Sequence, residues 1–582
     1  MARVGGGDPT AKIASPCGDP GRQIPGLRSV ASNSPIRWFR PAGMALALAG
    51  LAALVYWPVL TFDFVRWDDD INITQNPLLT APWSWQLVGQ LFAGRQALRF
   101  EPLHWLFFRL LHALFGFNPL GWHAFGLGLH LGATVLFYLV LREVGRLLLP
   151  ATEPWRVELG AWLGAAVWAV HPLRAEAVAW VTASTYPETT VSLLASFWCY
   201  LQASADPTRW RRWLGLTWVL AVAATASYPV GITYALWLIA VDCWLLPATP
   251  GRPAVLGSPA SRLSRAWCAK HAAFLVPAVL GVGFTLWSRF MTPGMWEAPP
   301  SLATLGLSTR LGMALASLTT LVEDLLWPSH LTPNLQPLVL QGWVQWQVVF
   351  MAVLAVLVLA LAWDGRRRHP GRTLFWLGFA ALALPCLGWT ERPKWPVDRY
   401  SYLVDLVLVG GAAVWLLRWA GGARARRVVV GTGAAVLVLG GAWATRRQIM
   451  IWRDSPALFL AMEQDPGFAE SPRMQGNVYF KWSAHEAASI HRATAVRLFN
   501  EAQQVFFQAI RAAVARGDYA EALALSVQLD YYAPLSPILH RERGAWLLRL
   551  GRPADALAEL QLARPGLKDD PRLESLLGEA QK

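Results

Sequence analysis

The chain has 582 residues, of which 54% are hydrophobic and only 15% are charged, and its mean hydropathy is +0.33. This composition excludes an ordinary soluble fold of this size, which would carry more charge. The 51 Lys and Arg outnumber the 37 Asp and Glu, but they cluster between apolar blocks, as in cytoplasmic loops of membrane proteins. We therefore predict a membrane protein that does not bind nucleic acid.

The N-terminal segment, residues 1–41, is rich in Gly, Pro and Ser and carries basic residues near its end. This composition predicts a disordered cytoplasmic tail. The apolar run from Ala42 to Leu60 is too long for a signal-peptide core and lacks an A-x-A cleavage site, so we interpret it as an uncleaved first span.

Apolar blocks of about 17 to 25 residues, long enough to cross a bilayer as helices, recur as far as residue 445. About eleven spans are predicted, near residues 42–60, 121–141, 157–170, 187–203, 213–227, 230–247, 271–289, 345–363, 373–389, 401–418 and 427–444. With a cytoplasmic N-terminus, the basic loops fall on the cytoplasmic side, as the positive-inside rule requires. The sequence thus predicts an all-α, polytopic membrane domain over residues 42–445.

Two further apolar stretches, Leu103–Phe117 and Leu307–Trp327, contain charged residues and do not fit this topology as spans. We interpret both as amphipathic helices on the outer membrane surface. A different topology in which either one spans the membrane is the alternative.

From residue 446 to residue 582 the long apolar blocks stop and an internal repeat begins. Gly517 and Gly551 lie 34 residues apart, and the same spacing separates two Ala, two Leu and two Pro. This is the period of tetratricopeptide repeats, which form α-solenoids that bind proteins. We predict such a solenoid on the outer side of the membrane, and an unrelated helical hairpin is the alternative.

The first predicted outer loop carries three consecutive carboxylates, Asp68, Asp69 and Asp70. Like charges this close raise at least one pKa, which suits a general base, and a triplet of acids can also hold a divalent cation. The alternative is a solvated acidic turn at the start of a helix. Single, scattered cysteines predict neither disulfides nor a Cys-based metal site.

Two other predicted outer loops are polar. His171 and Glu176 can form a polar cluster, although a helix break at Pro172 with Arg174 reaching towards the headgroups explains the same pattern. The third loop holds the cations at the membrane face.

Arg392, Lys394 and Arg399 in this third loop suit a lipid phosphate, because an Arg side chain binds phosphate oxygens with two parallel hydrogen bonds. Interfacial anchoring is the commoner role of such residues. Neither a Walker loop nor a dinucleotide-binding motif occurs in a suitable context, so ATP-driven and hydride-transfer mechanisms are unsupported.

Five motifs follow one another along the chain. They are Trp67-Asp68-Asp69 with Asn76-Pro77; Leu114-Phe115-Gly116-Phe117-Asn118-Pro119 followed by His123 and His130; His171-Pro172 to Trp180; Leu326-Trp327-Pro328; and Asp398-Arg399-Tyr400-Ser401-Tyr402-Leu403. As a set they resemble the transmembrane and tetratricopeptide-repeat O-mannosyltransferases and their bacterial relatives, whose membrane part is similar to type C glycosyltransferases. The resemblance covers residues 42–582.

The resemblance implies transfer of a mannose-like sugar from a polyprenyl-phosphate carrier to a protein or other acceptor on the outer membrane face. It implies that Asp68 and Asp69 are catalytic, with one of them as the base, and that Arg399 lies near the carrier phosphate. It assigns no role to His171 or Glu176. It requires no cofactor beyond a possible divalent cation, and it implies protein partners for the repeats.

Three departures from the family pattern concern charged positions. Glu101-Pro102 stands where Arg-Pro is usual, Ala183 to Glu188 stands where Gly-Arg-Lys-Asp is usual, and Ser227-Tyr228-Pro229 stands where Lys-Glu is usual. These departures keep a second hypothesis open, a catalytically inactive scaffold whose repeats gather partners. A transporter ranks last, because its spans would need more buried polar groups.

High usage of Ala, Gly, Arg and Trp is typical of a bacterium with a GC-rich genome. We therefore expect the inner membrane as the location, with the repeats in the periplasm.

Overall fold

The computed structural model of the chain describes residues 41–92, 100–246, 265–291, 306–329, 331–333, 343–365, 370–388, 397–488 and 491–581. Within these residues the chain forms twenty-three α-helices, joined by short helical turns, and no strand. The predicted all-α class is confirmed. The predicted N-terminal tail lies outside the described residues, except for its last residue.

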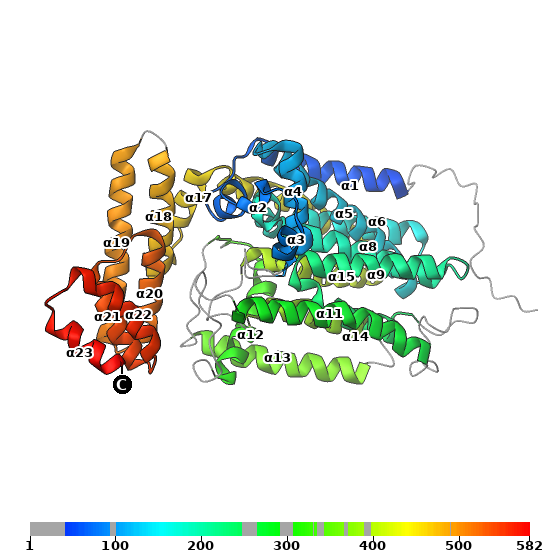
Figure 1. Cartoon of the computed structure of the whole chain (residues 1–582). Helices are drawn as coiled ribbons and strands as arrows, with labels where there is room; N and C mark the ends of the chain where they lie inside the picture. The colour runs from blue at the N-terminus through cyan, green and yellow to red at the C-terminus, as the bar shows by residue number, and fades with distance from the viewer. Residues whose placement is uncertain are drawn as a thin grey trace, which may run out of the picture.

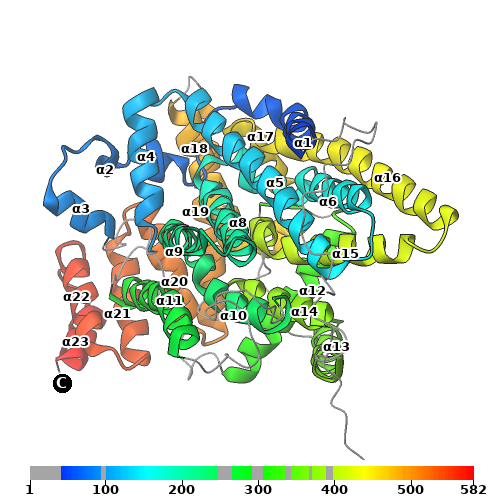
Figure 2. The ribbon, with the colours of Figure 1, turned by 90° about the vertical axis from the view of Figure 1, so that its right-hand side faces the viewer.

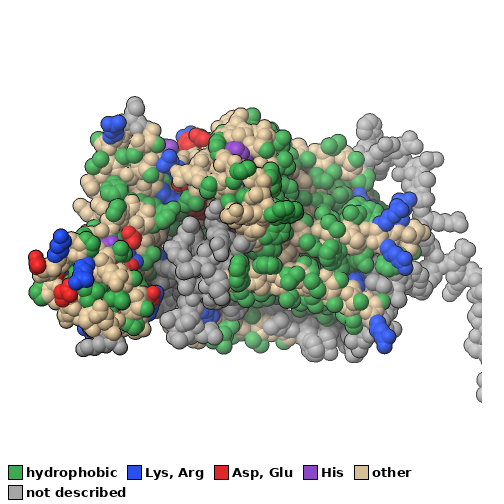
Figure 3. All heavy atoms as spheres, viewed as in Figure 1, with side chains coloured by type: hydrophobic (Ala, Val, Ile, Leu, Met, Phe, Trp, Pro, Cys, Tyr) green, Lys and Arg blue, Asp and Glu red, His purple; other side chains and the backbone are tan. Residues whose placement is uncertain are grey.

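The larger part of the molecule is a bundle of roughly parallel helices (Figures 1 and 2). Figure 3 shows that hydrophobic side chains are spread widely over the visible surface of this bundle and that few charged side chains lie among them, as expected for contact with lipid. Its helices are α1 (Pro41–Tyr56), α5 (Pro119–Leu148), α6 (Pro154–Ala169), α8 (Thr185–Ala205), α9 (Trp210–Ser227), α10 (Tyr234–Trp244), α11 (Arg265–Met291), α12 (Leu307–Leu326), α13 (Trp343–Gly365), α14 (Pro370–Ala383), α15 (Ser401–Ala420) and α16 (Arg424–Gln448).

Five stretches of the described residues are long and apolar enough to cross a membrane: Pro41–Thr61, Pro119–Leu148, Arg265–Trp287, Asp398–Ala420 and Arg424–Trp452. Shorter apolar helices are Gly231–Trp244, Val348–Leu357 and Gly371–Cys386. The other three predicted spans coincide with α6, α8 and α9. By the same criteria α6 is too short, and α8 and α9 are not apolar enough. The total of eleven spans stays a prediction.

Local sequence explains why the longest helix of the bundle begins where it does. The Asn118 side chain accepts a hydrogen bond from the Leu120 N–H at 3.1 Å and caps the first turn of α5. Pro119 follows at the first helical position, where its missing N–H costs nothing. The same Asn-Pro pair at Asn76 begins α2 (Pro77–Thr80).

A small layer of helices joins the loop after α1 to the bundle, and it is formed by α2, α3 (Trp85–Phe92) and α4 (Pro102–Phe115). Arg109 of α4 donates hydrogen bonds to the backbone carbonyls of Leu78 and Ala81, which ties α4 to α2. The two stretches predicted as amphipathic helices are helical, as α4 and α12.

The C-terminal part consists of α17 (Ser455–Glu463), α18 (Pro472–Ala488), α19 (Arg492–Ala515), α20 (Tyr519–Tyr532), α21 (Pro537–Arg549), α22 (Pro553–Ala563) and α23 (Pro571–Ala580). It lies at one end of the bundle (Figure 1). Gly517 and Gly551 follow α19 and α21 with φ of 74° and 70°, a left-handed conformation that favours glycine at a helix end. The tetratricopeptide-type solenoid stays a prediction.

The C-terminal part is joined to the bundle by a shared core. Trp452, Phe459 and Val478 are fully or almost fully buried in the same apolar cluster as the bundle side chains Tyr56 and Trp168. α16 also runs to Gln448, so the boundary predicted at residue 445 falls inside a helix.

Candidate functional site

The loop that carries the acidic triplet is irregular backbone between η1 (Trp57–Thr61) and η2 (Asp70–Thr74), which is a single π-helical turn. Asp68 has φ of 78°, and among the described residues it alone adopts this left-handed conformation without being glycine. Its carbonyl accepts the Asn72 N–H at 2.8 Å. Such strained backbone and π-turns concentrate at functional sites, because the surrounding structure must hold them in place.

Asp69 points into the bundle. Its side chain accepts three hydrogen bonds, from the Val65 N–H at 3.0 Å, the Thr182 N–H at 3.1 Å and the Thr182 hydroxyl at 2.6 Å. The residue is 1% exposed. Burial raises the pKa of Asp69 to about 7, and the three hydrogen bonds act in the opposite direction.

Asp68 and Asp70 face the C-terminal part instead. Lys481 of α18 lies 3.3 Å from Asp68 Oδ1 and 4.0 Å from Asp70 Oδ1. The Asp68 side chain is 34% exposed, and that of Asp70 is 16% exposed. The triplet is therefore divided, with the middle carboxylate tied to the bundle and its two neighbours directed at one ammonium group.

The segment that follows α6 connects the acidic loop to Arg399. It contains η3 (Pro172–Arg174), α7 (Ala175–Ala179) and η4 (Val181–Ser184). Thr182 of η4 binds Asp69, and Glu176 of α7 forms an ion pair with Arg399. The Arg399 guanidinium also lies 5.1 Å from the centre of the Trp180 ring. One short segment thus contacts both Asp69 of the acidic loop and Arg399 of the predicted phosphate-binding loop.

Among the described residues, Glu176 is the hydrogen-bonding partner of Arg399. Its backbone N–H and one guanidinium nitrogen bind the Glu176 carboxylate, and its side chain is 12% exposed. A guanidinium has five N–H donors, so the pairing with one carboxylate leaves others available. Arg392 and Lys394 lie outside the described residues, and their predicted role at a phosphate stays a prediction.

His171 has a structural position. Its Nδ1 accepts the Leu173 N–H at 3.3 Å, and its Nε2 lies 3.1 Å from the Leu325 carbonyl oxygen of α12. Burial lowers the pKa of His171 to about 3, and the nearby Arg174 charge lowers it further. The side chain therefore caps η3 as a neutral ring, and it contacts neither Asp69 nor Arg399 in any bond within the described residues.

The interpretation of Arg174 as a residue that reaches towards the headgroups is wrong. Its side chain is fully buried and forms an ion pair with Asp405 and a hydrogen bond with Ser401 at 3.1 Å. The Asp405 carboxylate compensates the buried positive charge of Arg174, which would be costly without an opposite charge beside it. Sequence reasoning missed Asp405, because a single acid within an apolar helix has no visible partner in the sequence.

The three departures from the family pattern lie near one another. His104, one turn after Glu101, lies 2.9 Å from Glu188 Oε1, and both side chains are almost fully buried. The Tyr186 hydroxyl donates to that of Tyr228 at 3.0 Å. The changed positions on α4, α8 and the turn after α9 therefore form one region beside η4, rather than three unrelated changes.

No group of three or more His, Cys, Asp or Glu residues that could hold a metal ion occurs among the described residues. A possible divalent cation was one expectation for the acidic triplet, and its residues do not provide such a group. Lys481 supplies the neighbouring positive charge instead.

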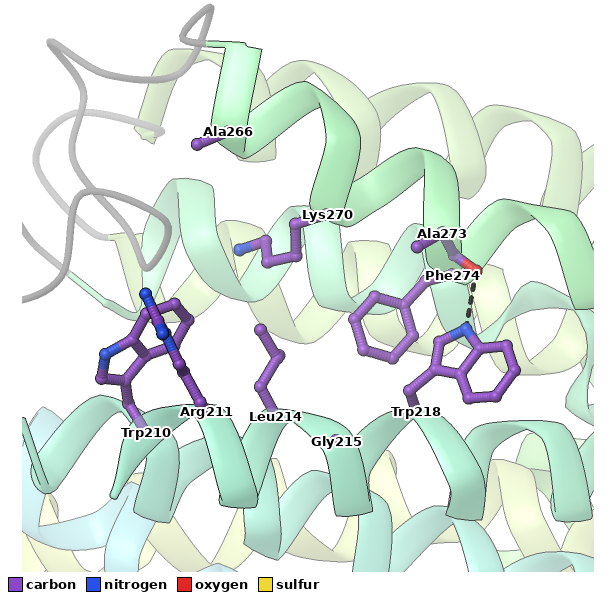
Figure 4. Close-up of a pocket in the computed structure, with 9 residues that line it drawn as sticks. All are labelled: Trp210, Arg211, Leu214, Gly215, Trp218, Ala266, Lys270, Ala273 and Phe274. Carbon is purple, nitrogen blue, oxygen red and sulfur yellow. Dashed lines mark hydrogen bonds between the residues drawn. The ribbon is translucent and has the colours of Figure 1, made fainter. Parts of the chain in front are cut away.

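A second region with buried charge lies far along the chain from the triplet. Asp242 of α10 accepts hydrogen bonds from Tyr200, Lys270 and Trp267, and His271 lies 2.9 Å from the same carboxylate. Lys270 also lines an apolar groove of about 380 Å³ between α9 and α11 (Figure 4). The groove residues are Trp210, Arg211, Leu214, Gly215, Trp218, Ala266, Lys270, Ala273 and Phe274.

The chain is similar to two curated relatives. Over 208 residues it is 33% identical to protein O-mannosyl-transferase Tmtc1 of Drosophila melanogaster, a match that covers 33% of this chain and 22% of the relative. Over 187 residues it is 32% identical to protein O-mannosyl-transferase TMTC1 of Homo sapiens, a match that covers 31% of this chain and 18% of the relative. The chain thus spans less than a quarter of the length of these relatives.

These matches support a relationship to that family over about a third of the chain. No protein-family model and no solved structure matches the chain.

Proposed function

We propose that the chain is a membrane glycosyltransferase that moves a mannose-like sugar from a polyprenyl-phosphate donor to a protein or other acceptor on the outer membrane face. The relatives are named as protein O-mannosyl-transferases, which supports this class of reaction. The proposed location is the inner membrane of a bacterium, with a cytoplasmic N-terminus and a C-terminal part in the periplasm that binds protein partners.

The observation that carries the proposal is the convergence of acidic and cationic side chains on one short segment. Thr182 holds Asp69 at 2.6 Å, and Glu176 and Trp180 hold Arg399. Transfer from a phosphate carrier needs a base at the acceptor and positive charge at the leaving phosphate. Asp69, which adjoins the base proposed below, and Arg399 come from parts of the chain that are far apart in sequence.

Asp68 is the proposed base. Its carboxylate is 34% exposed, whereas both oxygens of Asp69 are occupied by hydrogen bonds and the residue is 1% exposed. Asp69 is then a positioning residue that fixes the loop to η4. Of the two aspartates predicted as catalytic, Asp68 is thus the proposed base and Asp69 its structural support.

In the proposed step the acceptor hydroxyl gives its proton to the Asp68 carboxylate as its oxygen bonds to the anomeric carbon of the sugar. The bond between that carbon and the phosphate oxygen breaks, and the electron pair leaves with the polyprenyl phosphate. Arg399 interacts with the negative charge that accumulates on this phosphate.

The test is transfer of labelled sugar by the purified full-length protein in detergent, with polyprenyl-phosphate mannose as donor and host membrane extract as acceptor. We expect Asp68→Asn to lower the rate by about 100-fold or more, because general-base catalysis contributes that much. Glu463→Gln, an acid on α17 outside the proposed site, is the matched control and should keep the wild-type rate.

Absence of transfer by the wild-type protein, together with capture of a host protein that depends on the C-terminal part, would instead favour the inactive scaffold. The changed family positions that cluster around His104 and Glu188 are the structural support for the scaffold hypothesis.

A further inference from the structure

Lys481 lies on α18, in the C-terminal part, yet its charged contacts are on the first outer loop of the bundle. Its ammonium lies 3.3 Å from Asp68, 4.0 Å from Asp70 and 5.2 Å from the centre of the Trp67 ring. Its side chain is 11% exposed. A residue more than 400 positions along the chain therefore contacts two of the three carboxylates of the acidic triplet.

The charge of Lys481 is retained in this setting. Burial alone would lower its pKa, but the charges of Asp68 and Asp70 outweigh burial and raise the pKa above the usual value. Asp70 Oδ1 is buried and has no hydrogen-bond partner. The ammonium is thus the positive charge that compensates a buried carboxylate oxygen, which would otherwise be costly.

Backbone contacts keep the two parts in register around this lysine. The Arg66 N–H donates to Ser455 Oγ at 2.9 Å, and the Arg66 guanidinium donates to the Ala484 carbonyl at 3.1 Å. The Asp63 N–H donates to the Arg453 carbonyl at 3.0 Å. The loop is therefore fastened to Arg453, α17 and α18 just before Trp67, and Lys481 contacts the carboxylates that follow Trp67.

We infer that Lys481 is a positioning residue of the proposed site, which holds the Asp68 and Asp70 carboxylates and makes the C-terminal part a structural component of that site. This inference rests on the proposed function and extends it. The C-terminal part then does more than bind partners, because transfer depends on its docking against the loop.

The consequence concerns how the proposed base is placed. Lys481 holds the Asp68 carboxylate from the side of α18, at 3.3 Å. Loss of the ammonium removes this contact, so the carboxylate is no longer fixed where the acceptor hydroxyl must meet it.

The experiment compares full-length wild type with Lys481→Met, Lys481→Arg and Arg473→Met in the sugar-transfer assay and determines kcat and KM separately. Arg473 lies on the same helix and bonds Gln528 instead of the loop. We expect Lys481→Met to lower kcat by about 10-fold or more with little change in KM, because a misplaced base slows the chemical step without weakening donor binding. We expect Lys481→Arg to restore most of kcat and Arg473→Met to match wild type. An unchanged kcat in Lys481→Met would overturn the inference.

Hydrogen exchange tests the inference without catalysis. In Lys481→Met the loop amides from residue 64 to residue 76 should exchange faster, whereas amides in α5 should keep their wild-type rates. Faster loop exchange with no transfer by wild type would defeat the proposed function and leave the holding role of Lys481 intact. Unchanged loop exchange would defeat the role of Lys481 even if wild type transfers sugar.

Discussion

Two buried acidic regions of this protein are built in opposite ways. At Asp242 both carboxylate oxygens accept hydrogen bonds, and the partners come from neighbouring helices of the bundle. At the loop after α1, Asp68 stays a third exposed, Asp70 has an oxygen with no hydrogen bond from the described residues, and the compensating Lys481 comes from another part of the chain. A fully compensated charge stabilises a fold, whereas an incompletely compensated one is available for chemistry.

The largest expected effect separates the two regions by stability. Asp242→Ala leaves Lys270 buried without its counter-charge, so we expect the free energy of unfolding to fall by about 3 kcal/mol or more. Asp68→Asn keeps a side chain that tolerates the left-handed backbone and should cost less than about 1 kcal/mol. Thermal unfolding of both variants in detergent measures the difference.

The double variant Asp242→Ala/Lys270→Met sharpens this comparison. Because it removes both charges, it should regain part of the lost stability. In the folded fraction, Asp242→Ala should also retain sugar transfer. Equal losses of stability in the Asp242 and Asp68 variants would show that the two regions do not differ in the way described.

The second prediction concerns pH and Asp69. Its folded pKa of about 7 lies above its usual value of 3.8, so the folded state binds the proton more tightly than the unfolded state. The stability contributed by this group is complete below pH 3.8 and falls as the pH rises to about 7, by up to about 1.4 kcal/mol for each pH unit. Unfolding midpoints measured from pH 4 to pH 8 report this slope.

Asp69→Asn is the matched variant for this slope, because its amide does not titrate. Subtraction of its stability curve from that of wild type should isolate the Asp69 contribution. A difference curve that is flat between pH 4 and pH 7 would contradict the raised pKa.

The sequence was sufficient to predict the helical class, the apolar character of the bundle and the acidic triplet. It also indicated that Glu176 and Arg399 belong to polar segments between apolar blocks. It could not pair them, because the ion pair joins residues more than 200 positions apart and each loop by itself also fits a surface anchor.

Lys481 was missed for a different reason. It lies in a helix of the C-terminal part whose sequence carries no recognisable motif, and only the docking of α18 on the loop gives it a role. Arg174 was misjudged, because a buried partner inside an apolar helix leaves no local signal in the sequence. Compensation of charge across distant elements is a tertiary property, and local patterns do not report it.

The smallest effect tests how the bundle tunes the outer loop. Thr182→Val keeps the side-chain shape and the N–H bond to Asp69 but removes the hydroxyl bond of 2.6 Å. We expect stability at pH 8 to fall by about 1 kcal/mol, the net value of one such hydrogen bond. Because that bond favours the ionised carboxylate, its loss should also raise the pKa of Asp69 and extend the pH-dependent range upwards.

Thr74→Val is the control in the same loop, since the Thr74 hydroxyl contacts a backbone carbonyl at 3.4 Å and no carboxylate. If both variants gave the same pH curve, the Thr182 hydroxyl would have no special part in holding Asp69, and the N–H groups of Val65 and Thr182 would hold the carboxylate without it.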